Sequence, residues 1–462
     1  MIAFVLVLIA VIALLAGAHW YVWRRLFRDT TRGAGAVRRA GTVAVWVLPV
    51  LSVGALVSAR AGAPFWLQQA LAWPGYLWLV VLLYLVLALL AGEAVRAVWL
   101  RKGKYPRAAG TPESPEGPGF APSADDGTDG TDRTTVPSAS TASDGRALGS
   151  GTATMAETEA EAGVTALAGG GAGGGAGGGA GGGTATGVSR RLFVSRAVGA
   201  GAVAAAAGIV GHGTYGVLRG PGLKRVTVPL AKLPRSAHGF RIAVVSDIHI
   251  GPILGRAHTQ RIVDAINSAQ PDLVAVVGDM VDGSVADLGS AAEPLAQLRA
   301  RHGSFFVTGN HEYYSGAEEW IDHVRELGLD PLENERVEIA GGFDLAGVND
   351  LEGEATGAGP DFARALGDRD PSRASVLMAH QPVVIHDAVD HGVDLQLSGH
   401  THGGQLWPGN YLAELANPTV AGLERYGDTQ LYVTRGAGAW GPPVRVGAES
   451  DITIVQLASR QA

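Results

Sequence analysis

The chain has 462 residues, of which 47% are hydrophobic and 17% charged, and this length exceeds what one ordinary domain needs. Its formal net charge of −7 gives no reason to expect nucleic acid as a partner. The chain has no cysteine, which excludes disulfide bonds and thiolate metal sites and suits an oxidising compartment.

Three long uncharged runs predict a transmembrane region with three helices over residues 1–100. They are Met1–Trp23, Gly41–Ala59 and Ala61–Gly92, within which Trp73–Gly92 is the expected third span. About 20 apolar residues suffice to cross a bilayer. A cleavable signal peptide would begin with a basic region, and none precedes the first run. The alternative, a buried helical domain, fits three runs of this length poorly.

The basic residues predict the orientation of these spans. Six arginines lie between the first and second spans, and five basic residues follow the third. The loop after the second span has only Arg60. The positive-inside rule therefore places the amino terminus outside and the residues after Trp99 in the cytoplasm.

Residues 101–188 are predicted to be a disordered linker. Pro, Ser, Thr, Asp and Gly dominate this stretch, and Gly169–Gly183 repeats Gly-Gly-Gly-Ala. Such a composition buries too little apolar surface to offset the entropy of ordering it.

Residues 189–218 allow three readings. Ser189-Arg190-Arg191-Leu192-Phe193-Val194, followed by a weakly apolar run from Ala197 to Leu218, resembles a twin-arginine export signal. A fourth transmembrane helix is equally compatible. Both readings give a multi-pass cell-membrane protein with an extracytoplasmic carboxyl-terminal domain, and the first makes the twin-arginine export machinery a partner. A third reading, a helix that never crosses, leaves that domain in the cytoplasm.

Residues 226–462 alternate apolar runs with amphipathic stretches, which predicts an α/β domain. The expected strands are Phe240–Ser246, Leu273–Val277, Ser304–Val307, Ala374–Ala379, Asp394–Leu397, Leu431–Thr434 and Ile452–Leu457, and the expected helices are Arg256–Ala269 and Val285–Arg301. Ligands in such sheets collect beyond the carboxyl ends of the strands.

Five short motifs follow the predicted strands. They are Asp247-Ile248-His249, Gly278-Asp279, Gly309-Asn310-His311-Glu312, Met378-Ala379-His380 and Gly399-His400-Thr401-His402. In extended backbone, residues i and i+2 point to one side, so Asp247 and His249 are expected to reach one ion together, and His400 and His402 a common cavity. The glycines allow close backbone approach beside the ligands. Each motif alone is weak evidence, since a Gly-Asp pair is usually a turn and a buried histidine usually packs. Their ordered conjunction predicts a site for Mn, Fe or Zn, because its donors are oxygen and nitrogen.

Together these motifs resemble the signature of the calcineurin-like metallophosphoesterase superfamily, extended by Gly403-Gly404-Gln405. Arg435 to Pro443 further resembles the bacterial membrane-associated branch. The resemblance implies a four-layer α/β/β/α sandwich. It also implies two divalent metal ions, one held by Asp247, His249, Asp279 and His402 and the other by Asp279, Asn310, His380 and His400. His311 and the bridging Asp279 would be the catalytic residues.

The activity that the resemblance implies is hydrolysis of phosphate mono- or diesters by attack of a metal-bridging hydroxide. The substrate would be a phosphorylated small molecule, a lipid or a cell-wall polymer. Two alternatives stay open: hydrolysis of a lipid-linked pyrophosphate or phospholipid, and a membrane sensor that binds a phosphorylated ligand without turning it over. Asn349-Asp350 resembles a loop that approaches the site, and its role is left open.

Overall fold

The computed structural model describes residues 2–101 and 189–460. Apart from Arg101, the predicted linker therefore lies outside the described residues.

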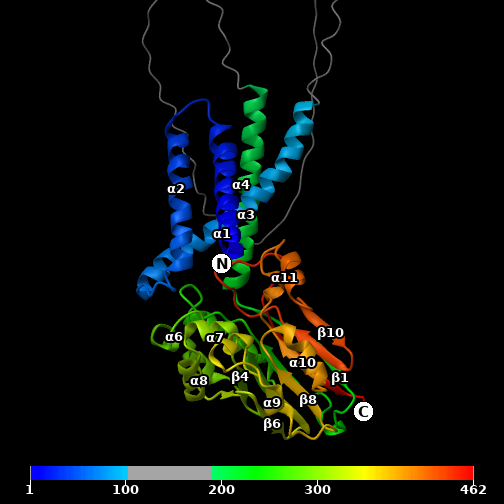
Figure 1. Cartoon of the computed structure of the whole chain (residues 1–462). Coiled ribbons are helices and arrows are strands. Elements are labelled where there is room, and N and C mark those ends of the chain that lie inside the picture. Colours follow the sequence, from blue (N-terminus) through cyan, green and yellow to red (C-terminus); the bar gives the residue numbers. More distant parts are fainter. Residues whose placement is uncertain (1, 102–188, 461–462) are drawn as a thin grey trace, which may run out of the picture. The chain divides into compact units, whose positions relative to one another are not determined.

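Four helices in the described residues are long and apolar enough to cross a membrane. They are α1 (Ile2–Trp23), α2 (Ala36–Val57), α3 (Phe65–Arg101) and α4 (Arg190–Leu218), with a π-helical turn over Arg24–Arg28 (Figure 1). α3 is much longer than the predicted span over Trp73–Gly92. It continues through Pro74 and Gly92, residues that helices tolerate in an apolar environment.

Helix α4 packs into the same bundle as the first three helices. Ala202, Ala206 and Val210 of α4 lie in one buried cluster with Val80 and Leu89 of α3. The Arg190 guanidinium donates to the carbonyl of Trp99 at 2.7 Å. This packing is compatible with a fourth span over residues 189–218, and the fourth-span and twin-arginine readings both stay predictions.

The carboxyl-terminal part contains two six-stranded sheets. Their strand orders are β1-β12-β2-β3-β4-β5 and β10-β11-β9-β8-β7-β6. The first sheet comprises β1 (Gly222–Leu230), β2 (Arg241–Val245), β3 (Leu273–Val277), β4 (Ser304–Val307), β5 (Asp330–Pro331) and β12 (Asp451–Ser459). The second comprises β6 (Glu335–Ile339), β7 (Phe343–Gly347), β8 (Ala374–Met378), β9 (Leu395–Ser398), β10 (Gly422–Tyr426) and β11 (Thr429–Val433).

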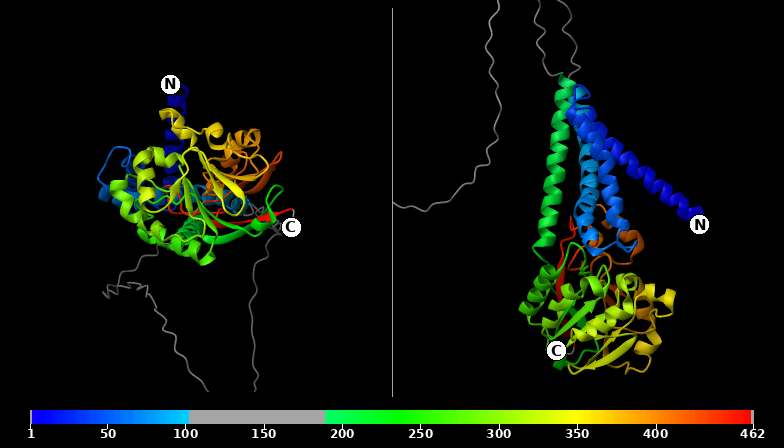
Figure 2. Two further views of the ribbon diagram at one scale, coloured as in Figure 1. Left: turned by 90° about the horizontal axis from the view of Figure 1, so that it is seen from below. Right: turned by 90° about the vertical axis from the view of Figure 1, so that its left-hand side faces the viewer.

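The two sheets pack face to face between outer helices (Figures 1 and 2). Valine and leucine side chains of both sheets, such as Val244 and Val376, form the central core. α5 (Arg256–Ala269), α6 (Val285–Ala292) and α8 (Ala317–Glu326) cover the first sheet, and α9 (Phe362–Leu366) and α10 (Ile385–Asp390) cover the second. Two short helices, α7 (Asn310–Ser315) and α11 (Asn410–Ala416), complete the domain. The predicted four-layer fold is confirmed.

Three details differ from the sequence-based prediction. The helix expected over Val285–Arg301 is wrong after Ala292, because Pro294 has no N–H to donate and the chain tightens into a 3₁₀ turn over Glu293–Gln297. The domain's first strand begins at Gly222, ahead of the predicted Val226. Five strands were not predicted. The sheet-edge strands β1, β5, β6 and β10 are short or carry exposed polar residues. The fifth, β7, is a buried interior strand whose apolar run is interrupted by Asp344.

Strand direction brings the motifs together. β2, β3 and β4 are parallel neighbours in one sheet, and β7, β8 and β9 are parallel neighbours in the other. Five motifs begin within three residues of the ends of β2, β3, β4, β8 and β9. Their side chains therefore meet at one edge of the sheet pair.

Candidate metal centre

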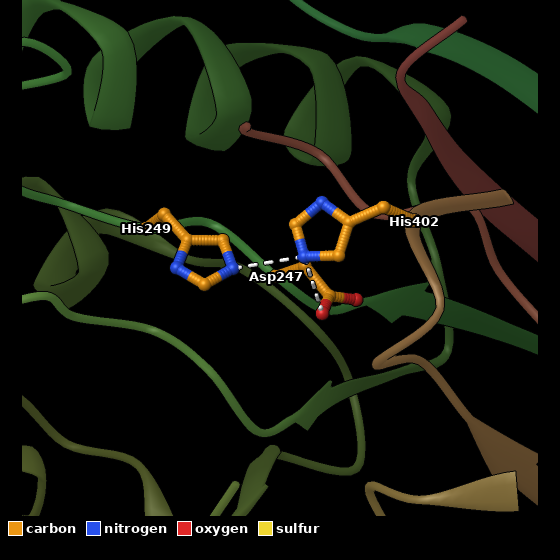
Figure 3. A group of neighbouring side chains, drawn as sticks. All are labelled: Asp247, His249 and His402. Atoms are coloured by element: carbon orange, nitrogen blue, oxygen red, sulfur yellow. Dashed lines mark hydrogen bonds and ion pairs between the residues drawn. The ribbon is translucent and has the colours of Figure 1, made fainter. Parts of the chain in front are cut away.

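The first group of ligands consists of Asp247, His249 and His402 (Figure 3). The Nε2 atom of His402 lies 3.3 Å from Asp247 Oδ1 and 3.0 Å from His249 Nε2. All three side chains are buried. Three donors converging this closely in the interior are suited to one cation.

The second group consists of Asp279, His380 and His400. The Asp279 Oδ2 atom lies 3.1 Å from His380 Nε2 and 3.9 Å from His249 Nε2 of the first group. The rings of His380 and His400 meet edge to face, with centroids 5.1 Å apart. The Asp279 carboxylate thus faces both groups.

Two further donor atoms support a cation fit. Asn310 Oδ1 and His400 Nδ1 are buried and make no hydrogen bond with the described residues. A buried polar atom without a partner is costly and needs an explanation, and a bound ion is one such explanation. Carboxylate, imidazole and amide donors together match a divalent transition metal. The structure thus brings together six of the seven side chains expected to bind metal, and the seventh, Asn310, follows β4 with a buried, unpartnered Oδ1 atom.

The backbone at these ligands is strained, and the extended-backbone argument for their convergence is wrong. Asp247 and His249 have φ of 52° and 49°, and Asp279, His400 and His402 are also left-handed. Non-glycine residues rarely adopt this conformation, which costs roughly 1–2 kcal/mol each. Asp247 and His249 lie in one group, and His400 and His402 lie in the two adjacent groups. The turns after the strands, and not the alternation of side chains along a strand, orient these ligands toward the site.

Close backbone approach at the glycines is confirmed at Gly309. A Cβ atom there would overlap with the Oδ1 atom of Asp279. Gly278, on the facing loop, has φ of 72°, which suits only glycine well. The loops after β3 and β4 therefore approach each other at backbone distance, and a side chain at either glycine would overlap with the facing loop.

Sequence reasoning missed Asp282. Its Oδ1 atom lies 2.9 Å from His249 Nδ1 and 2.7 Å from His311 Nδ1. One carboxylate therefore orients a metal ligand and the expected catalytic histidine. The available signal was its position three residues after Asp279, beside the bridge between Ile250 and Val281.

Arg445 was also missed. Its buried guanidinium donates to the carbonyl oxygens of Gly438 at 2.7 Å and His402 at 3.0 Å. Burial lowers its pKa to about 10, so the group stays charged at neutral pH. Arg445 fixes the loop that carries His402.

Asp350 connects two loops of the site through hydrogen bonds. Its carboxylate accepts from the Gln381 amide at 2.9 Å, and its backbone N–H donates to Thr308 Oγ1. It thus ties the loop after β8, next to His380, to the loop after β4.

Exposed aromatic side chains flank His311. Its ring meets those of Tyr314 and Trp440 at centroid distances of 5.5 and 5.9 Å. Both aromatic residues are exposed. His311 therefore lies at the mouth of the cluster.

Charge interactions within the cluster decide which ligands hold protons. Burial raises the pKa values of Asp247 and Asp279, but the neighbouring histidines outweigh it and hold both well below their usual range. Burial lowers the pKa of His249, but the carboxylates of Asp282 and Asp279 outweigh it and bring the pKa to about 9. Burial lowers the pKa values of His400 and His402 to about 4.

Divalent-cation affinity is expected to rise from neutral pH to about pH 9, where His249 loses its proton. Below that pH a cation must displace this proton, so affinity should increase about tenfold per pH unit for each proton released. Mn²⁺ titration calorimetry in buffers of different ionisation enthalpy would measure the affinity and the number of protons released on binding. An affinity that stays flat over this range, without proton release, would contradict the expectation.

Comparison with known proteins agrees with this geometry. Residues 240–404 match the family profile described as calcineurin-like phosphoesterase. A "Transmembrane protein with metallophosphoesterase domain" from Danio rerio is 40% identical over 259 residues, covering 53% of this chain and 59% of the relative. The chain thus spans about three fifths of the length of the vertebrate relatives that it matches.

Two bacterial relatives are covered more completely. An "Uncharacterized metallophosphoesterase" from Helicobacter pylori strain J99 is 37% identical, covering 58% of this chain and 72% of the relative. Another from Aquifex aeolicus is 33% identical, covering 52% of this chain and 92% of the relative. With its fold, its cluster of ligands and these relatives, the chain belongs to the calcineurin-like metallophosphoesterase family.

Proposed function

We propose that the chain is a membrane-anchored phosphoric ester hydrolase that works with two divalent cations. The observation that carries this proposal is the Asp279 carboxylate, which lies between two groups of buried ligands. Family membership supports a hydrolase, and the four long apolar helices support an anchor. Mn, Fe and Zn suit the donor set.

Seven side chains of the protein would bind the cations that promote ester cleavage. When bound, a pair of divalent cations supplies Lewis-acid polarisation of the phosphate and lowers the pKa of the attacking water. Asp247, His249 and His402 would hold one cation, and Asn310, His380 and His400 the other, with Asp279 shared.

His311 would donate a proton to the leaving oxygen. Its backbone N–H donates to Asp279 Oδ1 at 2.9 Å, which places it beside the shared ligand. Asp282 takes the Nδ1 side of the ring, so Nε2 is left for the substrate. Burial raises the pKa of Asp282, but His249 and His311 hold it well below its usual range, so Asp282 remains an ionised acceptor. Proton transfer by a positioned histidine contributes about 10²- to 10⁴-fold in rate.

The substrate and the side of the membrane belong to this proposal as well. The orientation given by the basic residues places the domain outside the cytoplasm, where phosphorylated small molecules, lipids or cell-wall polymers would be substrates. A membrane sensor that binds a phosphorylated ligand without hydrolysis is the second candidate. Unpartnered donor atoms would serve binding as well as turnover, so this candidate needs a kinetic test.

The test is hydrolysis of aryl phosphate mono- and diesters by the full chain purified in detergent. After metal removal, activity is expected to return with Mn²⁺, Fe²⁺ or Zn²⁺ and to disappear again with chelator. The ratio of monoester to diester turnover would show the preferred substrate class. Binding of the esters with full metal content but no turnover would favour the sensor instead.

A further inference from the structure

The segment from Gln405 to Ala416 has an unusually apolar surface. It contains one charged residue, Glu414, and includes α11. No side chain of α11 is buried. Leu412 and Leu415 are 72% and 85% exposed, and Trp407 and Tyr411 are also exposed.

This exposure is concentrated in one region of the domain. Between residues 222 and 460, the exposed large apolar side chains are Leu223, Tyr314, Val383, Trp407, Tyr411, Leu412, Leu415 and Trp440. Four of them lie in the 405–416 segment. A fifth, Trp440, is tied to that segment because Gln405 bonds to both its N–H and its carbonyl, at 3.0 and 2.9 Å. A contiguous apolar patch of this kind marks an interaction surface.

The patch is continuous with the long apolar helices. The Tyr84 hydroxyl of α3 donates to the carbonyl of Trp407 at 2.8 Å. Leu406 and Val446 pack against the cluster that contains Val80 and Tyr84. The patch therefore begins where α3 meets the domain.

The length of α3 indicates how deep in the bilayer the contact between Tyr84 and Trp407 lies. Tyr84 and Arg96 lie on the same helix, twelve residues apart, which corresponds to about 18 Å at 1.5 Å per residue. Arg96 pairs with Glu93, which also pairs with Arg25, and these charged groups mark the cytoplasmic boundary in the proposed orientation. Because a hydrocarbon core is about 30 Å thick, the Tyr84 contact lies at or inside the opposite boundary, and tilt of α3 only lowers it further.

We propose that the 405–416 segment inserts Trp407, Tyr411, Leu412 and Leu415 into the surface of the bilayer that α1–α4 cross. Tryptophan and tyrosine are the side chains that favour the membrane interface, and leucines of a short amphipathic element reach the acyl boundary. Trp440 links this segment to the ring of His311. The metal centre consequently opens next to the lipid headgroups. This surface does not depend on the proposed hydrolysis.

The absence of cysteine makes a direct test possible, because a single introduced thiol carries the only label. Leu415→Cys would be compared with Ser372→Cys, an exposed control residue that precedes β8 and therefore lies at the sheet edge opposite the metal centre. Each full-length variant would receive a polarity-sensitive fluorophore and be placed, one copy per disc, in nanodiscs of phosphatidylethanolamine and phosphatidylglycerol. Spin-labelled lipids would serve as quenchers.

The Leu415→Cys label is expected to emit at shorter wavelength and to lose at least half of its intensity to the spin-labelled lipids. The Ser372→Cys label should keep its aqueous spectrum and intensity. Equal, aqueous behaviour of the two labels would overturn the proposal. So would a Leu415→Cys signal that arises only when two copies share a disc, because a second copy of the chain would then cover the patch. Neither readout uses catalytic activity, so failure here leaves the proposed hydrolysis untouched.

Discussion

Replacement of Asp279 by Asn is expected to lower phosphate-ester turnover by about 10³-fold or more. The amide has nearly the same shape, and its oxygen still accepts the His311 N–H, so the fold should persist. What disappears is the negative charge between the two ligand groups, where Lewis-acid catalysis supplies several kcal/mol. A loss of about 4 kcal/mol corresponds to a factor of about 10³.

The measurements are turnover of an aryl phosphate and metal content of the same preparation. Metal content should fall together with activity. Asp322→Asn, on the exposed face of α8, is the matched control and should retain both. An Asp279→Asn variant with full metal content and full turnover would refute the shared-ligand arrangement.

Replacement of Glu312 by Ala is expected to give the largest loss of stability among single changes near the centre. The buried carboxylate accepts from the backbone N–H groups of Asp279 at 3.0 Å, Met280 at 2.8 Å and Gly309 at 2.6 Å. Alanine leaves three buried donors without a partner, at about 1–3 kcal/mol each. The loops that present Asp279 and Asn310 would lose their common anchor.

Thermal unfolding of the full chain in detergent would measure this effect. The midpoint temperature of unfolding should fall by roughly 10 °C, given about 2–4 °C per kcal/mol for a domain of this size. Glu449→Ala removes an exposed glutamate from a loop and should change the transition by no more than about 2 °C. Equal behaviour of the two variants would show that the three backbone donors find water or other partners.

The sequence was most informative where buried strands end in polar residues. Runs such as Leu273–Val277 are apolar throughout because helices and a second sheet cover both faces, so their limits were clear and the Asp279 loop followed directly. Edge strands such as Glu335–Ile339 combine charged and apolar residues and give no comparable signal.

The parts of the site that could not be predicted depend on tertiary contacts. Asp282 acts by accepting from two histidines that are 33 and 29 residues away in sequence, and Arg445 by bonding a loop 43 residues away. The left-handed backbone at Asp247 and His249 could not be read from residue type either, since Asp and His adopt it more often than most residues but still only in a small minority of cases. Spacing along the chain therefore identified the ligands but gave the wrong reason for their convergence.

The short connection between α4 and β1 has a consequence for how a substrate would reach the proposed hydrolase. Only Arg219, Gly220 and Pro221 separate the end of the helix from the first strand. The Gly/Pro/Ser-rich stretch precedes α4 in the chain, so it does not add length to the connection between α4 and the domain. A domain joined to a membrane helix by three residues cannot move far from that helix. It would sample molecules that diffuse laterally past it, and its encounter rate would follow their two-dimensional density.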